Sequence, residues 1–146
     1  MFKAEQKKIT AKILAYLSKE EIPIPTQINW QPIPFLGEWG ISLPLFPVAA
    51  DEARSGKRVN VPQRAQEIAS GLADTLGTPV GFNRVEAVKG YLNLYYETRE
   101  FSRRIVQAVL DRGDDYGRGE AKDQQVMVEF SQPNTHKSFH VGHLRS

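Results

Sequence analysis

The chain has 146 residues, of which 40% are hydrophobic and 25% charged, with a net charge of +2 and a pI near 8.9. This composition can bury a core and excludes a disordered or fibrous chain. There is no cysteine, which excludes disulfides and thiolate metal sites and fits a cytoplasmic protein. No run approaches the roughly 18 apolar residues of a membrane span, and the N-terminus lacks the apolar core of a signal peptide. The mild positive charge permits a nucleic-acid partner without requiring one.

The first half of the chain is predicted to contain two helices and a strand. A helix is expected over residues 2–20, where apolar residues repeat at helical spacing: Phe2, Ile9, Ile13 and Leu17. The next stretch, 22–37, contains four prolines and therefore excludes a regular helix. Residues 39–46 are predicted to form an edge strand, because Pro44 cannot donate to a strand ladder. A short helix is expected over 47–56.

The second half is predicted to contain a helix, a hairpin and a further helix. Pro62 suits the first turn of a helix over 62–76, and Gly77 suits its C-terminal cap. Two strands over 80–88 and 91–96 are separated by Lys89-Gly90, which is typical of a hairpin turn. Apolar residues on one face predict another helix over 101–110. The order of elements indicates an α+β domain with helices packed on a small antiparallel sheet.

The C-terminal segment has a different character. A charged, glycine-broken stretch follows the predicted domain 1–115, and we interpret 116–125 as a linker. Residues 126–130 form a short apolar run that suits a buried strand, and a helix is expected to start near His140. Strand, turn and helix in this order are the opening of a Rossmann-like nucleotide-binding unit, so 126–146 is predicted to begin a second domain.

The sequence His140-Val141-Gly142-His143 stands at that helix start. A helix N-terminus offers unpaired N–H groups to a phosphate, and a glycine lets a nucleotide lie close to the backbone. Two histidines on one helical face could stabilise charge that develops on a phosphate. The motif alone is equally compatible with two surface histidines around a loop glycine. A zinc site is disfavoured because no cysteine is present, and no protein-bound metal is expected.

The longer string Val128–Ser146 closely resembles the signature of the arginyl-tRNA synthetases, a class I family. The family pattern is Val-Glu-Phe-Ser-Ser-Pro-Asn, two residues, Lys, two residues, and His-x-Gly-His-Leu-Arg. Gln132 stands where a serine is frequent. Upstream stretches such as 37–42 and 90–93 resemble the family's N-terminal additional domain more loosely. The resemblance implies ATP-dependent attachment of arginine to its tRNA through an arginyl-adenylate, with Mg²⁺ accompanying the ATP, in a cytoplasmic, monomeric enzyme.

The resemblance also implies two groups of site residues. The ATP-binding and catalytic group, which would hold the phosphates and stabilise the adenylation transition state, is Lys137, His140, Gly142 and His143. The group that would bind the substrate arginine is Glu129, Ser131 and Asn134. A carboxylate at Glu129 could pair with the guanidinium group through two hydrogen bonds. The alternative for Glu129 and Lys137 is that both are ordinary surface charges.

In the family the additional domain contacts the tRNA elbow, and the matching hairpin residues are Lys89, Tyr91 and Asn93. An aromatic ring stacked on an unpaired base, with an amide at the base edge, is ordinary RNA recognition. These residues could equally be plain sheet residues.

Two other functions remain open: an RNA-binding module that uses 1–115 alone, and another nucleotidyltransferase with His-x-Gly-His. We expect that this chain is inactive by itself and that a natural protein continues beyond Ser146. Residues 118–146 are expected to be loosely held or paired against a neighbouring molecule, because the strand over 126–130 lacks its sheet.

Overall fold

The structure, a computed structural model, describes residues 2–33, 37–121, 123–128, 136, 138, 140 and 141. It divides into two compact units, Met1–Asp114 and Asp115–Ser146, which are described separately below. The domain limits expected from the sequence, with a linker over 116–125, stay predictions. Among the helices in the described part of the chain, none is long and apolar enough to cross a membrane.

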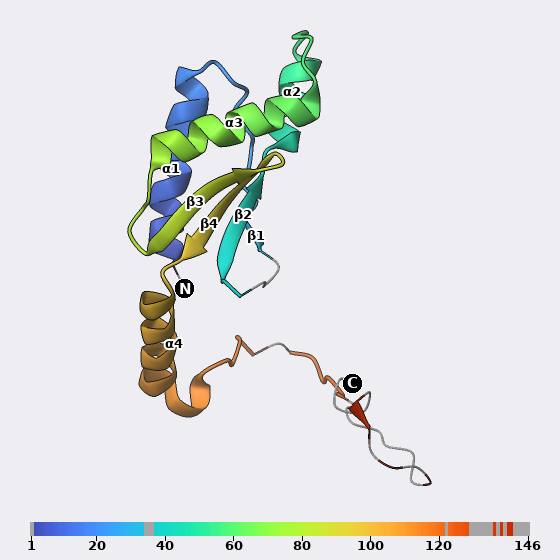
Figure 1. Ribbon diagram of the computed structural model, residues 1–146. Helices are drawn as coiled ribbons and strands as arrows, with labels where there is room; N and C mark the ends of the chain where they lie inside the picture. Colours follow the sequence, from blue (N-terminus) through green and yellow to red (C-terminus); the bar gives the residue numbers. More distant parts are fainter. Residues whose placement is uncertain are drawn as a thin grey trace. The chain divides into compact units, whose positions relative to one another are not determined.

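The first unit is an α+β fold, as the sequence predicts (Figure 1). Its elements in chain order are α1 (Lys3–Lys19), β1 (Gln31–Pro32), β2 (Gly40–Pro44), α2 (Phe46–Arg54), α3 (Val61–Leu76), β3 (Phe82–Val88), β4 (Tyr91–Tyr96) and α4 (Thr98–Arg112). A 3-10 turn over Gly113–Asp115 follows α4. The predicted helices and the hairpin are therefore confirmed, with small shifts at their ends.

The four strands form one antiparallel sheet in the order β1-β2-β4-β3. The prediction that the strand carrying Pro44 lies at the edge is wrong, because β2 pairs with β4 on one side and β1 on the other. The two-residue β1 pairs only with Ile41 and Ser42, so Pro44 lies at the end of β2, beyond the β1 pairing. A proline is tolerated there because no β1 residue needs its missing N–H.

Helix α3 shows how local sequence signals set an element's ends. Its N-cap is Asn60, whose side-chain Oδ1 accepts a hydrogen bond from the Gln63 N–H at 3.2 Å. Pro62 lies in the first turn, and Gly77 ends the helix with a positive φ of 56°. The helix crosses β3 and β4 (Figure 1), so its apolar stripe packs on the sheet.

The core lies between the helices and one face of the sheet. Along β4, Leu92 and Leu94 are buried, whereas Tyr91, Asn93 and Tyr95 alternate with them on the other face. Buried apolar residues of α1, α2, α3, the strands and two adjoining loops form one cluster: Ile9, Ile13, Leu17, Ile22, Ile41, Leu43, Leu45, Val48, Ala49, Ala65, Ile68, Ala69, Leu72, Leu76, Phe82, Leu92 and Leu94. The alternation leaves a second sheet face that no described helix covers.

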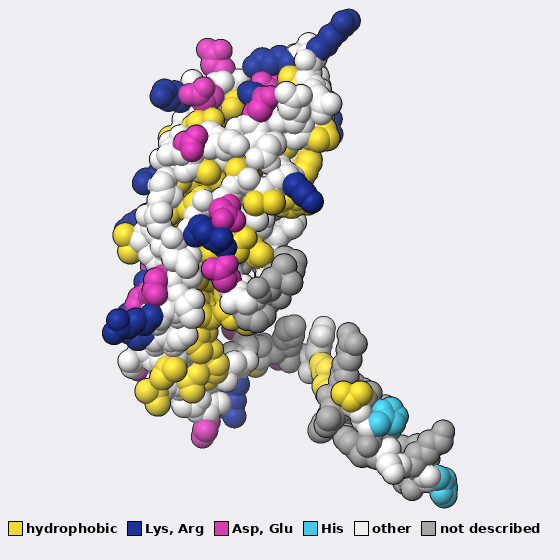
Figure 2. All heavy atoms as spheres, in the orientation of Figure 1, with side chains coloured by type: hydrophobic (Ala, Val, Ile, Leu, Met, Phe, Trp, Pro, Cys, Tyr) yellow, Lys and Arg dark blue, Asp and Glu magenta, His cyan; other side chains and the backbone are white. Residues whose placement is uncertain are grey.

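Helix α4 starts three residues earlier than the sequence pattern predicts. The Glu97 side chain caps it by accepting hydrogen bonds from the N–H groups of Arg99 and Glu100. Its first turns meet the rest of the unit through Phe101, which stacks near Phe2 and Tyr96. No described residue of α4 is fully buried. Figure 2 shows apolar side chains gathered over this helix.

In the second unit, the strand expected over 126–130 is not formed by the residues described. Val126, Met127 and Val128 lie in irregular backbone and are 71%, 83% and 73% exposed. A parallel strand needs hydrogen-bonding neighbours, and the described part of this unit contains no other strand. Residues 129–130 lie outside the described residues, as do 142–146, where most of the expected helix falls.

Candidate functional site

The hairpin turn Lys89-Gly90 is fixed to helix α3. Both residues have positive φ, 48° and 83°, as a two-residue type I′ turn requires. The Gly90 N–H donates to Oε1 of Gln66 at 2.8 Å, and its carbonyl accepts from the Leu45 N–H at 3.0 Å. A Cβ atom at Gly90 would lie 2.7 Å from the Phe46 ring. The turn therefore holds the start of β4 in a defined position.

The three residues expected to contact tRNA line one hollow on the uncovered sheet face. The hollow measures about 380 Å³ and is lined by residues from β1, β2 and the hairpin: Gln31, Pro32, Ile33, Ser42, Val88, Lys89, Tyr91 and Asn93. Tyr91 is 39% exposed and meets the Phe46 ring edge-on at 5.4 Å between centroids. The structure thus brings Lys89, Tyr91 and Asn93 together with an available aromatic ring.

Asn93 is oriented by its neighbour in the adjacent strand. Its Oδ1 accepts a hydrogen bond of 2.6 Å from the Ser42 hydroxyl, and the two residues are paired across β2 and β4. With the oxygen engaged, the amide nitrogen remains as a donor, and no hydrogen bond from it is found within the described residues. Asn93 can therefore present N–H groups to an acceptor in the hollow.

Arg84, which the sequence analysis missed, dominates the other end of the same face. Its guanidinium lies 4.1 Å from the Tyr95 ring centroid and pairs with Glu86 at 2.8 Å and with Glu38. The spacing of two between Arg84 and Glu86 along a strand is the signal that could have placed both on one face. One positive charge thus meets two carboxylates, Glu38 and Glu86, so this end of the face carries no excess positive charge. Lys89, in contrast, makes no ion pair with any residue the structure describes.

Of the residues expected to bind ATP and arginine, the structure describes one. His140 is described and exposed. The remaining six lie outside the described residues: Glu129, Ser131, Asn134, Lys137, Gly142 and His143. A shared cleft for these side chains therefore stays a prediction. In the part of the chain that is described, no group of three His, Asp or Glu side chains could hold a metal ion.

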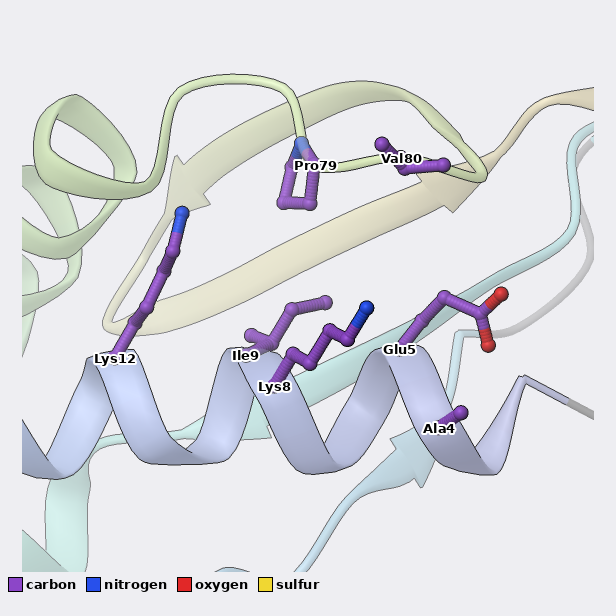
Figure 3. A pocket seen from close by; sticks show the side chains of 7 residues that line it. All are labelled: Ala4, Glu5, Lys8, Ile9, Lys12, Pro79 and Val80. Atoms are coloured by element: carbon purple, nitrogen blue, oxygen red, sulfur yellow. The ribbon is translucent and has the colours of Figure 1, made fainter.

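A second hollow, of about 260 Å³, lies between α1 and the loop before β3 (Figure 3). Ile9 forms its apolar floor beneath Pro79 and Val80, and the lysines Lys8 and Lys12 extend along its side. Its one carboxylate, Glu5, is engaged by Arg104, whose hydrogen bond lowers the Glu5 pKa. No convergent set of polar groups faces this hollow, which makes it a weaker candidate than the sheet face.

Comparison with known proteins points to one family. Residues 105–146 match the family model described as tRNA synthetases class I (R), catalytic domain. The chain is 46% identical over 80 residues to an arginine–tRNA ligase of Clostridium perfringens, a match that covers 53% of this chain and 14% of the relative. A second such ligase, from Alkaliphilus metalliredigens, is 37% identical over 82 residues, or 56% of this chain and 14% of the relative.

The fold is also similar to a solved structure, that of Thermus thermophilus arginyl-tRNA synthetase. The similarity has a TM-score of 0.51 at 24% sequence identity and covers 95% of this chain and 21% of that structure. At this identity the likeness concerns the fold. The chain spans about one seventh of the length of the curated relatives it matches.

Proposed function

We propose that this chain, which is similar to arginine–tRNA ligases and matches their family model over residues 105–146, is part of an enzyme that attaches arginine to its tRNA. The reaction would consume ATP and proceed through an arginyl-adenylate. The observation that carries this proposal is the string Val128–Ser146, together with the family match over 105–146. The match covers 14% of the relative's length, so the activity is assigned to a longer protein of which this chain is a part. The cytoplasmic location and monomeric state expected from the family belong to the same proposal.

In this proposal the ATP phosphates are bound by His140 and His143, one helical turn apart. Their N–H groups would stabilise the charge that develops on the α-phosphate as the arginine carboxylate attacks it. Gly142 would let adenosine approach the backbone, and Lys137 would support the phosphates. ATP would enter as its Mg²⁺ complex, in which the ion neutralises part of the phosphate charge.

Recognition of arginine is assigned to residues that follow the apolar run 126–128. The Glu129 carboxylate would accept two parallel hydrogen bonds from the planar guanidinium group of the substrate. Ser131 and Asn134 would bind the amino-acid end, with Asn134 near the α-amino group. A carboxylate partner favours arginine over uncharged amino acids, because an uncharged side chain would leave Glu129 without a partner.

We assign the contact with the tRNA elbow to the hollow on the sheet face. Tyr91 offers a half-exposed ring on which an unpaired base can stack, and Asn93 offers amide donors beside it. Lys89 adds a positive charge for a phosphate. The hydrogen bonds that fix Gly90 to Gln66 and Leu45 support this assignment, because a rigid platform loses little conformational freedom on binding.

The direct test is arginine-dependent exchange of pyrophosphate into ATP by the full-length protein. Arginine should stimulate exchange, with tRNA present if needed, whereas lysine at the same concentration should not. His140→Ala and His143→Ala should each reduce the exchange rate by about 10² to 10³, the typical effect of losing one transition-state donor. A full-length protein that shows no arginine-stimulated exchange with tRNA present would defeat the proposal.

A stand-alone RNA-binding module is the second candidate, and the sheet-face hollow is the observation that favours it. It predicts tRNA binding by this chain without any exchange activity in the full-length protein. Another nucleotidyltransferase with His-x-Gly-His would show exchange that depends on a different substrate. The residues Glu129-Phe130-Ser131 before the motif argue against it.

A further inference from the structure

A groove, separate from both hollows described above, lies between helix α1 and the segment 25–30. It measures about 560 Å³. One wall is the α1 stripe Lys3, Lys7, Thr10 and Leu14, whose members are three or four positions apart. The other wall includes Trp30, whose indole N–H donates to the Thr10 hydroxyl at 3.3 Å. This hydrogen bond ties the two walls together, so the groove is a fixed feature of the surface.

The groove carries net positive charge. Its lining contains two lysines, Lys3 and Lys7, and no acidic residue. Both lysines are exposed, and neither makes an ion pair within the described ranges. The nearest acid in sequence, Glu5, is bound to Arg104. The lining also includes the apolar residues Leu14, Pro25, Ile28 and Trp30, so a partner that combines negative charges with flat apolar groups fits this surface.

The groove and the sheet-face hollow are lined by residues that are neighbours in the sequence. Trp30 lines the groove, and the next residues, Gln31 and Pro32, form β1 and line the hollow that contains Tyr91 and Asn93. The strand β1 lies at the end of the sheet order, next to β2 alone. Consecutive residues of one segment therefore line the two sites, Trp30 the groove and Gln31 and Pro32 the hollow.

We propose that this groove extends the tRNA-contacting surface and that Lys3 and Lys7 bind phosphates of a tRNA whose unpaired base stacks on Tyr91. The inference rests on the proposed function of the sheet face. The hollow and the groove would bind different parts of the RNA. The hollow offers an aromatic ring and amide donors to a base, whereas the groove offers two positive charges, one helical turn apart, to the phosphates of the RNA backbone. A nucleic acid with unpaired bases presents both chemistries, and the proposed function makes this partner RNA.

Helix α1 supplies a matched control. Lys8 and Lys12 have the same spacing as Lys3 and Lys7, are also exposed and unpaired in the described part, and line the hollow of Figure 3 instead. With 100° of rotation per residue, the two pairs lie on opposite sides of the buried stripe of α1. Replacing either pair removes the same charge from the same helix.

The experiment measures binding of an arginine-tRNA transcript to the 146-residue chain between about 50 and 200 mM salt. Lys3→Ala/Lys7→Ala should reduce the slope of log K against log salt by about 1.4 to 1.8 and weaken binding by at least about tenfold near 0.1 M. Lys8→Ala/Lys12→Ala should change the slope by less than about 0.5. Tyr91→Ala should weaken binding by about fivefold or more without changing the slope. Circular dichroism would verify that each variant is folded.

Each outcome separates the two proposals. If Tyr91→Ala weakens binding while the two lysine pairs behave alike, the groove inference is overturned and the sheet-face assignment stands. If only Lys3→Ala/Lys7→Ala has an effect, the groove binds RNA without the hollow, and the claim of one continuous surface is overturned. If the unaltered chain does not bind the transcript, the sheet-face assignment fails and the groove inference fails with it.

Discussion

Glu52 is a carboxylate with 2% of its surface exposed, held by two cations. Arg64 donates to it from Nε at 2.7 Å and Lys57 from Nζ at 3.0 Å, which links α2 to the start of α3. Glu52→Gln removes the charge but keeps the shape, leaving the partly buried Arg64 with only its exposed partner, Glu67. We expect the free energy of unfolding to fall by about 1–3 kcal/mol at pH 7, measured by urea denaturation.

The pH dependence follows from the hydrogen bond of Arg64, which lowers the pKa of Glu52 below its usual 4.5. A lowered pKa in the folded state gives stability that is present above the unfolded pKa and lost as the pH falls through the folded one. The difference between wild type and Glu52→Gln should therefore shrink below about pH 4.5. As a control, Glu67→Gln removes the exposed partner of Arg64 and should cost less than about 0.5 kcal/mol. Equal losses in both variants would contradict this account.

Gly90 is constrained twice, by its φ of 83° and by the Phe46 ring that a Cβ would approach to 2.7 Å. Gly90→Ala should lower the free energy of unfolding by about 2–4 kcal/mol, because backbone strain and overpacking add. The control is Gly56→Ala, where φ is 99° but nothing lies within 4 Å, and strain alone of about 1 kcal/mol is expected. Two similar losses in thermal or urea unfolding would show that the Phe46 contact is unimportant.

At the scale of elements, the sequence predicts what is decided locally. The ends of α3 follow from Asn60, Pro62 and Gly77, and the hairpin follows from Lys89-Gly90. The place of β2 in the sheet is decided by pairing with β4, about fifty residues later, and by a two-residue partner, β1, that has no periodicity of its own. The prediction of an edge strand from Pro44 was therefore wrong, because it considered β2 without its partners.

Helix α4 is attached mainly through one side chain. Phe101 lies with its ring centroid 5.2 Å from Tyr96, 6.1 Å from Phe2 and 6.3 Å from Trp39. Arg104 adds an ion pair to Glu5 of α1 at 2.7 Å. Phe101→Ala should therefore loosen α4 locally, and its amide hydrogens should exchange about tenfold faster while those of α3 are unchanged. Val106→Ala is the control on the same helix, since Val106 is 57% exposed. Uniform acceleration across α3 and α4 would show that α4 has no separate opening.

At the scale of the whole molecule, sequence and structure inform different parts of the candidate site. Lys89, Tyr91 and Asn93 depend on a sheet face, and the structure shows that face and adds Arg84, which only the strand register places there. Of the residues expected to bind ATP and arginine, all but His140 lie outside the described residues, so their arrangement stays a prediction from the motif. For this proposed site the sequence predicts more than the fold does, because binding of phosphates and of a guanidinium group requires particular residue types.

The two units should also differ in what they contribute to stability. The described apolar cluster lies within the first unit, and the described residues from 115 to 128 are exposed. A fragment of residues 1–114 should therefore have the same midpoint of urea unfolding as residues 1–146. The two free energies of unfolding should agree to within about 0.5 kcal/mol. A fragment of residues 1–97 lacks Phe101 and should be less stable by about 1–3 kcal/mol, because Phe2 and Tyr96 lose their ring contact. The fluorescence of Trp30 and Trp39 would report both transitions. A higher midpoint for the longer chain would mean that residues after Asp114 stabilise the fold, contrary to their exposure.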